Sequence, residues 1–191
     1  DTTYTWLANG MQESVTNPDG KIVSFEYDAL GRRTAKIANK EINRYVWDGN
    51  VLLHEWKYDL KERPRLVVEG DDLVYDKSEP VENLITWVYE EGSFVPSAKI
   101  IGEEKFSIIN DYIGRPIQAY SEAGELVWET DYDIYGRLRN LQGEKSFILF
   151  RQLGQVEDVE LDGLYYNRFR YYDSNVGNYT SKDPLSLGGS M

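Results

Sequence analysis

One five-residue pattern recurs along the chain and restricts the folds open to it. Asp-x-x-Gly-Arg occurs at residues 28–32, 111–115 and 133–137. An Asp that leaves a strand can bond a backbone N–H two or three residues on, and a Gly three positions later takes positive φ without steric cost. The pattern therefore predicts tight turns between strands. The predicted turn residues are Asp28, Gly31, Arg32, Asp111, Gly114, Arg115, Asp133, Gly136 and Arg137.

The residues between turns alternate with period two. Leu126, Trp128, Thr130 and Tyr132 would share one face of a strand, and further Gly-rich turns recur at intervals of about 22 residues. Such alternation is typical of half-buried strands, and a repeat of this length suits a hairpin unit. We predict an all-β fold in which antiparallel hairpin repeats form a curved sheet. One irregularity needs a bulge or a longer turn: Gly20 and Gly31 are 11 residues apart, whereas Gly124 and Gly136 are 12 apart.

Composition removes several classes of function. Lys and Arg number 21 against 33 Asp and Glu, which gives a net charge of −12. This balance disfavours nucleic acid and anionic membranes as partners. There is no cysteine, so disulfides and thiolate chemistry are excluded, and no apolar run approaches the ~20 residues of a membrane span. The 15 tyrosines indicate half-buried sheet faces.

The organisation along the chain suggests two parts of a longer polypeptide. The first residues show no initiator Met and no signal-peptide pattern, so we expect the chain to be cut from a larger protein. Residues 1–149 are predicted to form the repeat sheet, and 150–191 a terminal segment. Residues 57–83, rich in charge and containing Pro64 and Pro80, are predicted to be a charged insertion or a peripheral hairpin. Exposed strand edges would make an isolated piece prone to association.

An aromatic stretch dominates the terminal segment. "DGLYYNRFRYYD" at 162–173 contains five aromatic residues and two arginines. If the stretch is one strand, both of its faces carry rings, which suits a packed wall with arginines stacked between tyrosines. A sugar-binding platform of exposed tyrosines remains an alternative. Stacking of single-stranded nucleic acid would require a basic groove as well, for which two arginines are thin support.

These turns and this stretch together resemble a known family. Tyr27 and Tyr132 precede the Asp of their turns, and such Tyr-Asp-x-x-Gly-Arg units resemble the YD repeats of Rhs (rearrangement hot spot) proteins. The end of the chain resembles the signature that closes the Rhs repeat-associated core. The matching residues are Gly163, Tyr165, Tyr166, Asn167, Arg168, Arg170, Tyr171, Tyr172, Asp173, Gly177, Asp183 and Pro184.

The resemblance implies a β-sheet that spirals into a hollow shell around a C-terminal polymorphic toxin. In the family, an Asp-Pro-x-Gly motif and a second acidic motif some twenty residues on perform aspartyl-type self-cleavage, which makes Asp183 the candidate catalytic residue here. This sequence departs from the pattern, with Ser at 174 and 186 and Asn at 178. The second motif does not occur before Met191, and a proton-sharing pair needs both carboxylates. The fragment is therefore not expected to cleave itself.

The predicted function is structural, as the terminal part of an Rhs-type shell that encapsulates and delivers a toxin. Self-cleavage through Asp183 and recognition of a cell-surface glycan are the alternatives. Expected partners are the rest of the shell and the enclosed toxin, with a secretion-system component as a further possibility. The expected location is secreted or on a bacterial cell surface. With His54 as the only histidine, neither a metal nor a cofactor is predicted.

Overall fold

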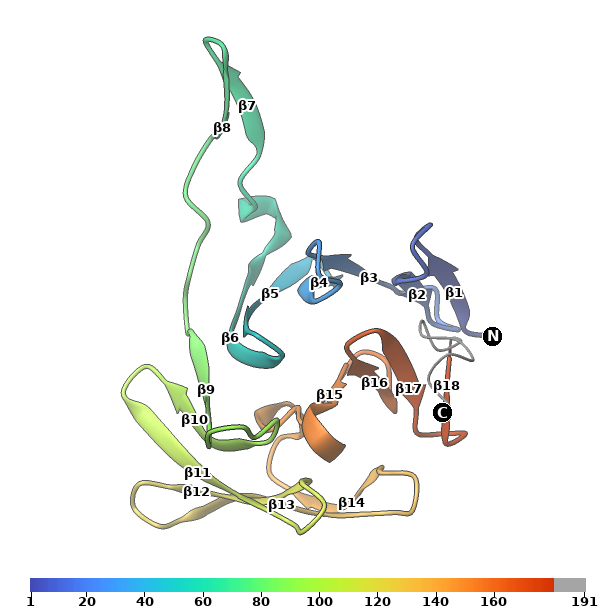
Figure 1. Ribbon diagram of the computed structural model, residues 1–191, viewed down its shortest axis with the longest axis vertical. Coiled ribbons are helices and arrows are strands. Elements are labelled where there is room, and N and C mark those ends of the chain that lie inside the picture. Colours follow the sequence, from blue (N-terminus) through green and yellow to red (C-terminus); the bar gives the residue numbers. More distant parts are fainter. Residues whose placement is uncertain (181–191) are drawn as a thin grey trace.

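The computed structural model describes residues 1–180, and nearly all of their regular secondary structure is antiparallel β, which takes up about half of these residues. Twelve strands form one sheet in simple meander order, which Figure 1 shows as a C-shaped curve. The predicted all-β class with a curved antiparallel sheet is confirmed. The strands of this curved sheet are β1 (Thr3–Trp6), β2 (Gln12–Thr16), β3 (Ile22–Tyr27), β4 (Arg33–Ala38), β5 (Glu41–Asp48), β6 (Val51–Asp59), β9 (Ile85–Tyr89), β10 (Pro96–Ile101), β11 (Glu104–Asn110), β12 (Pro116–Ser121), β13 (Leu126–Tyr132) and β14 (Leu138–Gln142).

Many strands of the curved sheet are joined by the same turn. Its first residue accepts a hydrogen bond from the N–H of the Gly three positions later, and donates its own N–H to the carbonyl of the residue after that Gly. This is a three-residue hairpin loop in which a type I turn ends on a left-handed residue, a conformation that Gly adopts at least cost. The turns of this kind begin at Leu7, Asn17, Asp28, Asp111, Ser121 and Asp133.

A β-bulge accommodates the irregular spacing of the turn glycines. Ala119 pairs with Trp128, but the next residue, Tyr120, pairs with Leu126, so Val127 is an extra residue in β13. The bulge restores the phase of the strand, and Trp128 and Thr130 remain buried while Asp131 is exposed. The longer interval between Gly124 and Gly136 therefore leaves the faces of β13 in register.

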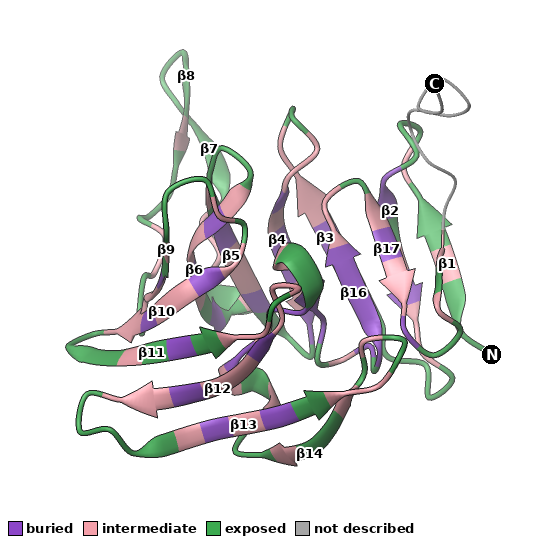
Figure 2. Ribbon diagram, turned by 60° about the horizontal axis from the view of Figure 1, so that its bottom comes forward, coloured by how far each residue is buried: buried purple, intermediate pink, exposed green. Residues whose placement is uncertain are grey.

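A smaller sheet lies inside the curve. It contains β15 (Val156–Glu157), β16 (Leu164–Asn167), β17 (Arg170–Asp173) and β18 (Asn178–Tyr179), and we call it the terminal sheet. Figure 1 shows β16 and β17 facing the inner side of the curved sheet. The apolar core fills the space between the two sheets, where Val23, Phe25 and Trp128 pack with Leu164, Tyr166 and Tyr171. In Figure 2 the buried residues accordingly line the facing strands.

The aromatic stretch is a hairpin, so its interpretation as one strand is wrong. Tyr166 pairs with Tyr171 and Tyr165 with Tyr172, across a turn at Arg168-Phe169 in which Arg168 has a φ of +55°. The turn lacks the Gly or Asn-Gly that signals such hairpins. The near-palindrome Tyr-Tyr-Asn-Arg-Phe-Arg-Tyr-Tyr was the available signal, because it places like residues opposite one another once the chain reverses.

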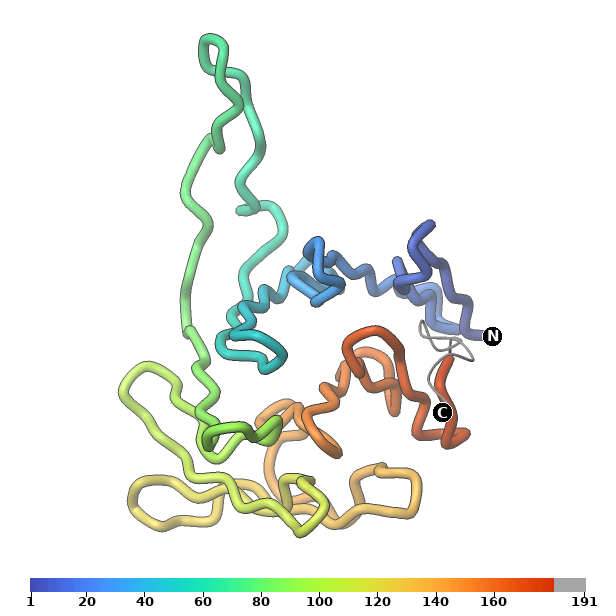
Figure 3. Tube along the Cα trace, in the orientation of Figure 1, coloured from blue at the N-terminus to red at the C-terminus, as the bar shows by residue number. Residues whose placement is uncertain are grey.

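Residues 60–83 leave the curved sheet between β6 and β9. A short 3-10 helix, η1 (Leu60–Glu62), precedes a separate two-stranded hairpin of β7 (Leu66–Glu69) and β8 (Asp72–Tyr75). This projecting arm stands clear of both sheets in Figures 1 and 3. Two more 3-10 turns, η2 (Lys145–Phe147) and η3 (Gln152–Gly154), lead from β14 to the terminal sheet. No helix within residues 1–180 has the length and apolar character needed to cross a membrane.

Candidate functional site: the seam between the two sheets

The Asp-x-x-Gly-Arg segments form three matched turns. In the first, Asp28 Oδ1 accepts hydrogen bonds from the N–H groups of Leu30 and Arg32, both at 2.9 Å, and Asp28 Oδ2 lies 2.7 Å from Arg32 Nε. Burial acts to raise the pKa of Asp28, but the hydrogen bonds from Arg32 and Leu30 outweigh it and lower that pKa. The carboxylate therefore holds the loop and orients the arginine.

The second turn repeats this arrangement, and the third differs in where its arginine side chain lies. Asp111 holds Arg115 through Nε at 2.7 Å, and the Arg115 guanidinium lies 4.7 Å from the ring centre of Tyr132. Asp133 accepts the N–H of Arg137 at 3.0 Å, while the Arg137 side chain reaches Asp162 of the terminal segment at 3.8 Å. The arginines thus connect each turn to a different neighbour.

All three turns meet the terminal segment through the same atom, the carbonyl oxygen of their glycine. Gly31 O accepts a hydrogen bond from Tyr166 Oη at 3.4 Å, and Gly136 O accepts one from Tyr165 Oη at 2.9 Å. Gly114 O accepts the backbone N–H of Leu153 at 3.2 Å. The repeat turns and the terminal signature are therefore the two sides of one interface, which we call the seam.

The tyrosines of the terminal hairpin divide between the two halves of the curved sheet. On one face of the hairpin, Tyr166 Oη accepts the backbone N–H of Arg33 at 2.9 Å, and Tyr171 Oη lies 3.3 Å from Tyr27 Oη. On the other face, Tyr172 donates to the carbonyl of Tyr135 at 3.1 Å. Burial raises the pKa of Tyr166 to about 12 and holds the pKa of Tyr171 well above its ordinary value, so both hydroxyls stay protonated at physiological pH.

A buried ion cluster lies at the centre of the seam. Arg33 Nη1 is 2.6 Å from Asp158 Oδ2, and Lys36 Nζ is 3.4 Å from Asp158 Oδ1 and 2.6 Å from Glu160. The Arg33 guanidinium also lies between the rings of Tyr45 and Tyr166, at 4.8 and 4.5 Å. Burial disfavours the charge on Arg33, but Asp158 and the surrounding groups reverse this and raise its pKa. Two basic residues of β4 thus hold two acidic residues of the terminal segment.

A second ion cluster joins the terminal segment to the residues that lead into it from β14. Arg151 and Glu157, both fully buried, form an ion pair through Nε and Nη2 of the guanidinium. The same guanidinium donates to the carbonyls of Ile148 and Phe150 at 2.9 and 2.6 Å. Lys145 bridges Glu157 and Asp162 at 2.9 and 2.8 Å. These contacts fix the path of the chain between the curved sheet and β16.

A third polar group lies where β6, β9 and β10 meet η2, just before the terminal segment. Trp87 Nε1 donates to Glu55 Oε1 at 3.0 Å, and Lys99 Nζ donates to the carbonyl of Phe147 at 2.6 Å. Burial raises the pKa of Glu55, while Lys99 and the Trp87 hydrogen bond oppose that rise. Burial lowers the pKa of Lys99 from 10.5 to about 8, although Glu55 acts in the opposite direction.

The depressed pKa of Lys99 predicts a rise in stability at alkaline pH. Between about pH 8 and 10.5 the unfolded state binds more protons at Lys99 than the folded state does, so the free energy of unfolding increases with pH. We expect a gain of about 1–2 kcal/mol between about pH 7.5 and 9.5 in urea unfolding. Below about pH 8 the full cost of the buried charge is present. Lys99→Met should abolish this gain, and an unchanged slope in that variant would assign it to another group.

The contact of η3 with the curved sheet allows a paired glycine test. Gly154 has a φ of +82°, and a Cβ there would lie 2.7 Å from the carbonyl oxygen of Phe94. Gly124 has a similar φ of +79° with open space around it. Gly124→Ala should cost about 1–2 kcal/mol from backbone strain, and Gly154→Ala about twice that, as measured by urea unfolding. Equal costs would show that η3 moves freely away from Phe94.

The remaining signature residues mostly shape the terminal sheet. A Cβ on Gly163 would meet the side chains of Asn175 and Ser174, and one on Gly177 would meet the ring of Tyr135 at 2.6 Å. Asn167 donates to Tyr179 Oη at 2.8 Å, and the Arg170 guanidinium lies 3.7 Å from the centre of that ring. Asp173 accepts the N–H of Asn175, and Arg168 donates to Asn50.

Neither a metal site nor the catalytic candidate is found within the described residues. Asp183 and Pro184 lie outside residues 1–180, so the geometry of the proposed cleavage motif is not described. Among residues 1–180, no group of three or more His, Cys, Asp or Glu side chains could hold a metal ion. His54 lies in β6, with Nδ1 2.9 Å from the Thr86 hydroxyl.

Sequence reasoning missed the residues of the ion clusters. Arg33, Lys36 and Asp158 are each almost fully buried. The available signal was in β4, where Arg33 and Lys36 fall among alanines and isoleucine in "RRTAKIA", with no acidic residue between Asp28 and Glu41. Their partners are more than 120 residues away, at Asp158 and Glu160. A buried cation predicts a carboxylate partner, but it does not say which one.

The curved repeat sheet, with its matched turns closed by a terminal sheet, defines a YD-repeat shell protein. Residues 1–187 match the family described as the teneurin YD-shell. The chain therefore belongs to the teneurin YD-shell family, within the wider group of Rhs and YD-repeat proteins, as the sequence resemblance implied. Its role is structural, as part of a YD shell.

Several toxins and toxin components are similar to this chain. Double-stranded DNA deaminase toxin A of Burkholderia cenocepacia (strain H111) is 31% identical over 181 residues, covering 86% of this chain and 12% of that protein. Probable deoxyribonuclease RhsB of Dickeya dadantii (strain 3937) is 29% identical over 192 residues, covering 97% and 12%. The crystal structure of TcdB2-TccC3-TEV has the same fold, with a TM-score of 0.65, 20% identity, and coverage of 96% of this chain and 9% of that one. The chain thus spans about an eighth of the length of these curated relatives.

Proposed function

We propose that this chain is the closing section of a hollow shell that encapsulates and delivers a C-terminal toxin, and that the terminal sheet seals it. The observation that carries this proposal is the seam, in which the glycine carbonyls of all three repeat turns accept hydrogen bonds from the terminal segment. The names of the relatives, which include a deaminase toxin and a probable deoxyribonuclease, support a toxin as the cargo. Export to the cell surface or the medium belongs to the same proposal.

Protease protection in the parent polypeptide tests this function. We expect any polypeptide encoded after residue 191 to resist limited proteolysis while the shell is intact. Asp158→Ala, which removes a partner from the buried ion cluster, should make that polypeptide sensitive. Val68→Ser, in the projecting arm, is the matched control and should leave the protection unchanged. The proposal would be contradicted if the polypeptide after residue 191 were as sensitive to protease in the unaltered protein as in Asp158→Ala. A gene that ends without a cargo sequence would also contradict it.

The two alternative functions differ in their support. Self-cleavage through Asp183 stays a prediction, and Asp183→Asn in the parent polypeptide would decide it, since unchanged cleavage would remove this residue from the mechanism. For glycan recognition, an exposed tyrosine platform was the motivating idea. Tyr165, Tyr166 and Tyr171 are at most 2% exposed, so these rings pack in the seam and offer no open platform. The geometry therefore favours the sealing function.

A further inference from the structure

The projecting arm exposes apolar side chains that the rest of the described chain does not cover. Leu66 is opposite Tyr75 and Val68 is opposite Leu73, so all four share one face of the hairpin. Their exposed fractions are 59%, 66%, 74% and 70% respectively. A contiguous apolar face of this kind on a protruding element marks an interaction surface, and an isolated two-stranded hairpin gains stability from further strands.

The arm also has an open hydrogen-bonding edge along β7. Within residues 1–180, β7 pairs only with β8. The carbonyl of Arg65 accepts the N–H of Asp76 at 2.9 Å, so odd-numbered residues of this strand direct their backbone groups towards β8. The N–H and C=O groups of Leu66 and Val68 therefore point away from β8, along an edge that can accept another strand.

We propose that β7 pairs antiparallel with β7 of a second copy of this chain, about a two-fold axis at Val67. Two conditions set the register: opposed residues must lie on the same face, and the free backbone groups must meet. Both are satisfied when Leu66 lies opposite Val68 of the second copy and Val67 opposite its own equivalent. Arg65 then lies opposite Glu69 of the second copy, and by symmetry this ion pair forms twice. The result is a four-stranded sheet whose apolar face is continuous across both arms.

Charge complementarity selects this partner and this edge. Pairing through β8 about Val74 would instead place Asp72 opposite Asp76 of the second copy, twice, and like charges opposed across strands are unfavourable. Antiparallel pairing of β7 also brings the acidic tip of one arm, Glu69 to Asp72, to the base of the other. Arg65 lies at that base, while Arg63 and Lys77 beside it already pair with Glu26 and Glu62, so Arg65 is the cation that the second tip would meet.

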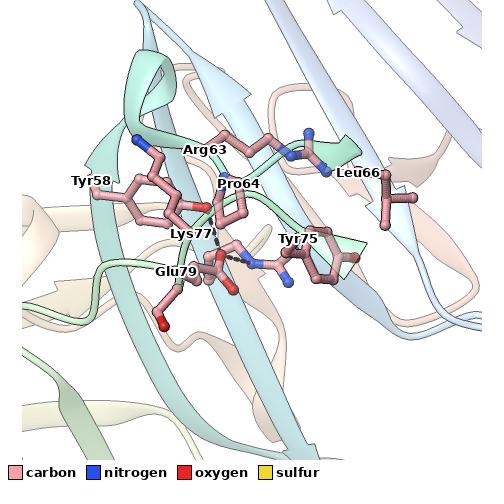
Figure 4. Close-up of a pocket in the computed structure, with 9 residues that line it drawn as sticks. Tyr58, Arg63, Pro64, Leu66, Tyr75, Lys77 and Glu79 are labelled. Carbon is pink, nitrogen blue, oxygen red and sulfur yellow. Dashed lines mark hydrogen bonds and ion pairs between the residues drawn. The ribbon is translucent and has the colours of Figure 1, made fainter. Parts of the chain in front are cut away.

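An open pocket at the base of the arm lies where the second tip would arrive. It has a volume of about 890 Å³, and Figure 4 shows Arg63, Pro64, Leu66, Tyr75 and Lys77 around it. Glu79, in the segment that returns from β8, lines this pocket and joins it to the curved sheet. Its carboxylate binds Arg44 Nε of β5 at 2.7 Å and Tyr58 Oη of β6 at 2.5 Å. In the proposed register Gly70 of the second copy lies opposite Pro64, at the rim of this pocket. The inference concerns the projecting arm and is independent of the sealing function.

Site-specific cross-linking tests the two-fold axis. The chain has no cysteine, so a single introduced thiol reports its own neighbour. Residues opposed in a non-hydrogen-bonded pair have Cα atoms about 4.5 Å apart, which a disulfide can span. Val67→Cys should therefore form a covalent dimer under mild oxidation. Leu73→Cys, exposed on β8, is the matched control and should remain largely uncross-linked. Equal cross-linking of the two variants, or none in Val67→Cys, would overturn the proposal.

Charge reversal tests the register by sedimentation equilibrium. Arg65→Glu or Glu69→Arg alone opposes like charges twice and should weaken dimerisation roughly tenfold. The double variant exchanges the charges and should restore the dimer. A protein that is monomeric at all concentrations would overturn the proposal. So would a dimer that is unaffected by both single changes, as expected for pairing through β1 and β14, the edge strands of the curved sheet among the described residues. Circular dichroism confirms that each variant is folded.

Discussion

Asp158→Ala should lower the free energy of unfolding by about 3–5 kcal/mol, as measured by urea unfolding followed by tryptophan fluorescence. Asp158 is fully buried and is the ion-pair partner of Arg33 at 2.6 Å and of Lys36 at 3.4 Å. Without it, Arg33 keeps its charge in a site closed to water, because arginine cannot lose its proton in proteins. The cost is thus the desolvation of an unpaired guanidinium.

Two further variants separate the charge from the packing at this site. Asp162→Ala removes an exposed carboxylate that pairs with Lys145 at 2.8 Å, and should cost less than about 1 kcal/mol. The double change Arg33→Met and Asp158→Leu replaces the whole pair with apolar groups and should recover much of the lost stability. If Asp158→Ala were as mild as Asp162→Ala, water would have to reach the Arg33 site.

Trp87→Ala should be comparably destabilising, by about 3–5 kcal/mol, because it removes a large and almost fully buried ring. The ring packs edge-on against Phe150 at a centroid distance of 4.7 Å, and its Nε1 donates to the buried Glu55. Phe150 begins the terminal segment, so the cavity would open between the curved sheet and that segment. We therefore expect faster proteolysis near residues 150–155 together with the loss of stability.

Trp87→Phe is the matched variant, since it keeps a ring and removes the donor to Glu55. It should cost about 1–3 kcal/mol, the price of one unsatisfied buried acceptor. Trp56→Ala is a change of the same type, in a half-buried ring of β6 that packs in a separate cluster with Ile42 and Tyr58. It should cost less and leave proteolysis at 150–155 unchanged. A similar proteolytic response in both alanine variants would mean that Trp87 does not secure the terminal segment.

The fold class could be predicted because its signals are local. Alternation along residues such as Leu126 to Tyr132 depends only on which face is buried, and the glycines of the repeated turns are needed for positive φ. The hairpin at 164–173 was missed because its turn, Arg168-Phe169, carries none of the usual turn residues. Here the pairing of Tyr166 with Tyr171 and the packing of both rings outweigh the weak local preference.

The amino-acid order by itself determined the β class, the repeated turns and the need for a bulge or a longer turn near β13, since each depends on residues within a few positions of one another. Only the tertiary structure decided that the three glycine carbonyls meet one segment, that Arg33 finds Asp158, and that β7 pairs on one side only within residues 1–180. The physical reason is the curvature of the sheet. A small twist at each strand, summed over twelve strands, brings residues more than 100 positions apart into contact, and no local pattern encodes that sum.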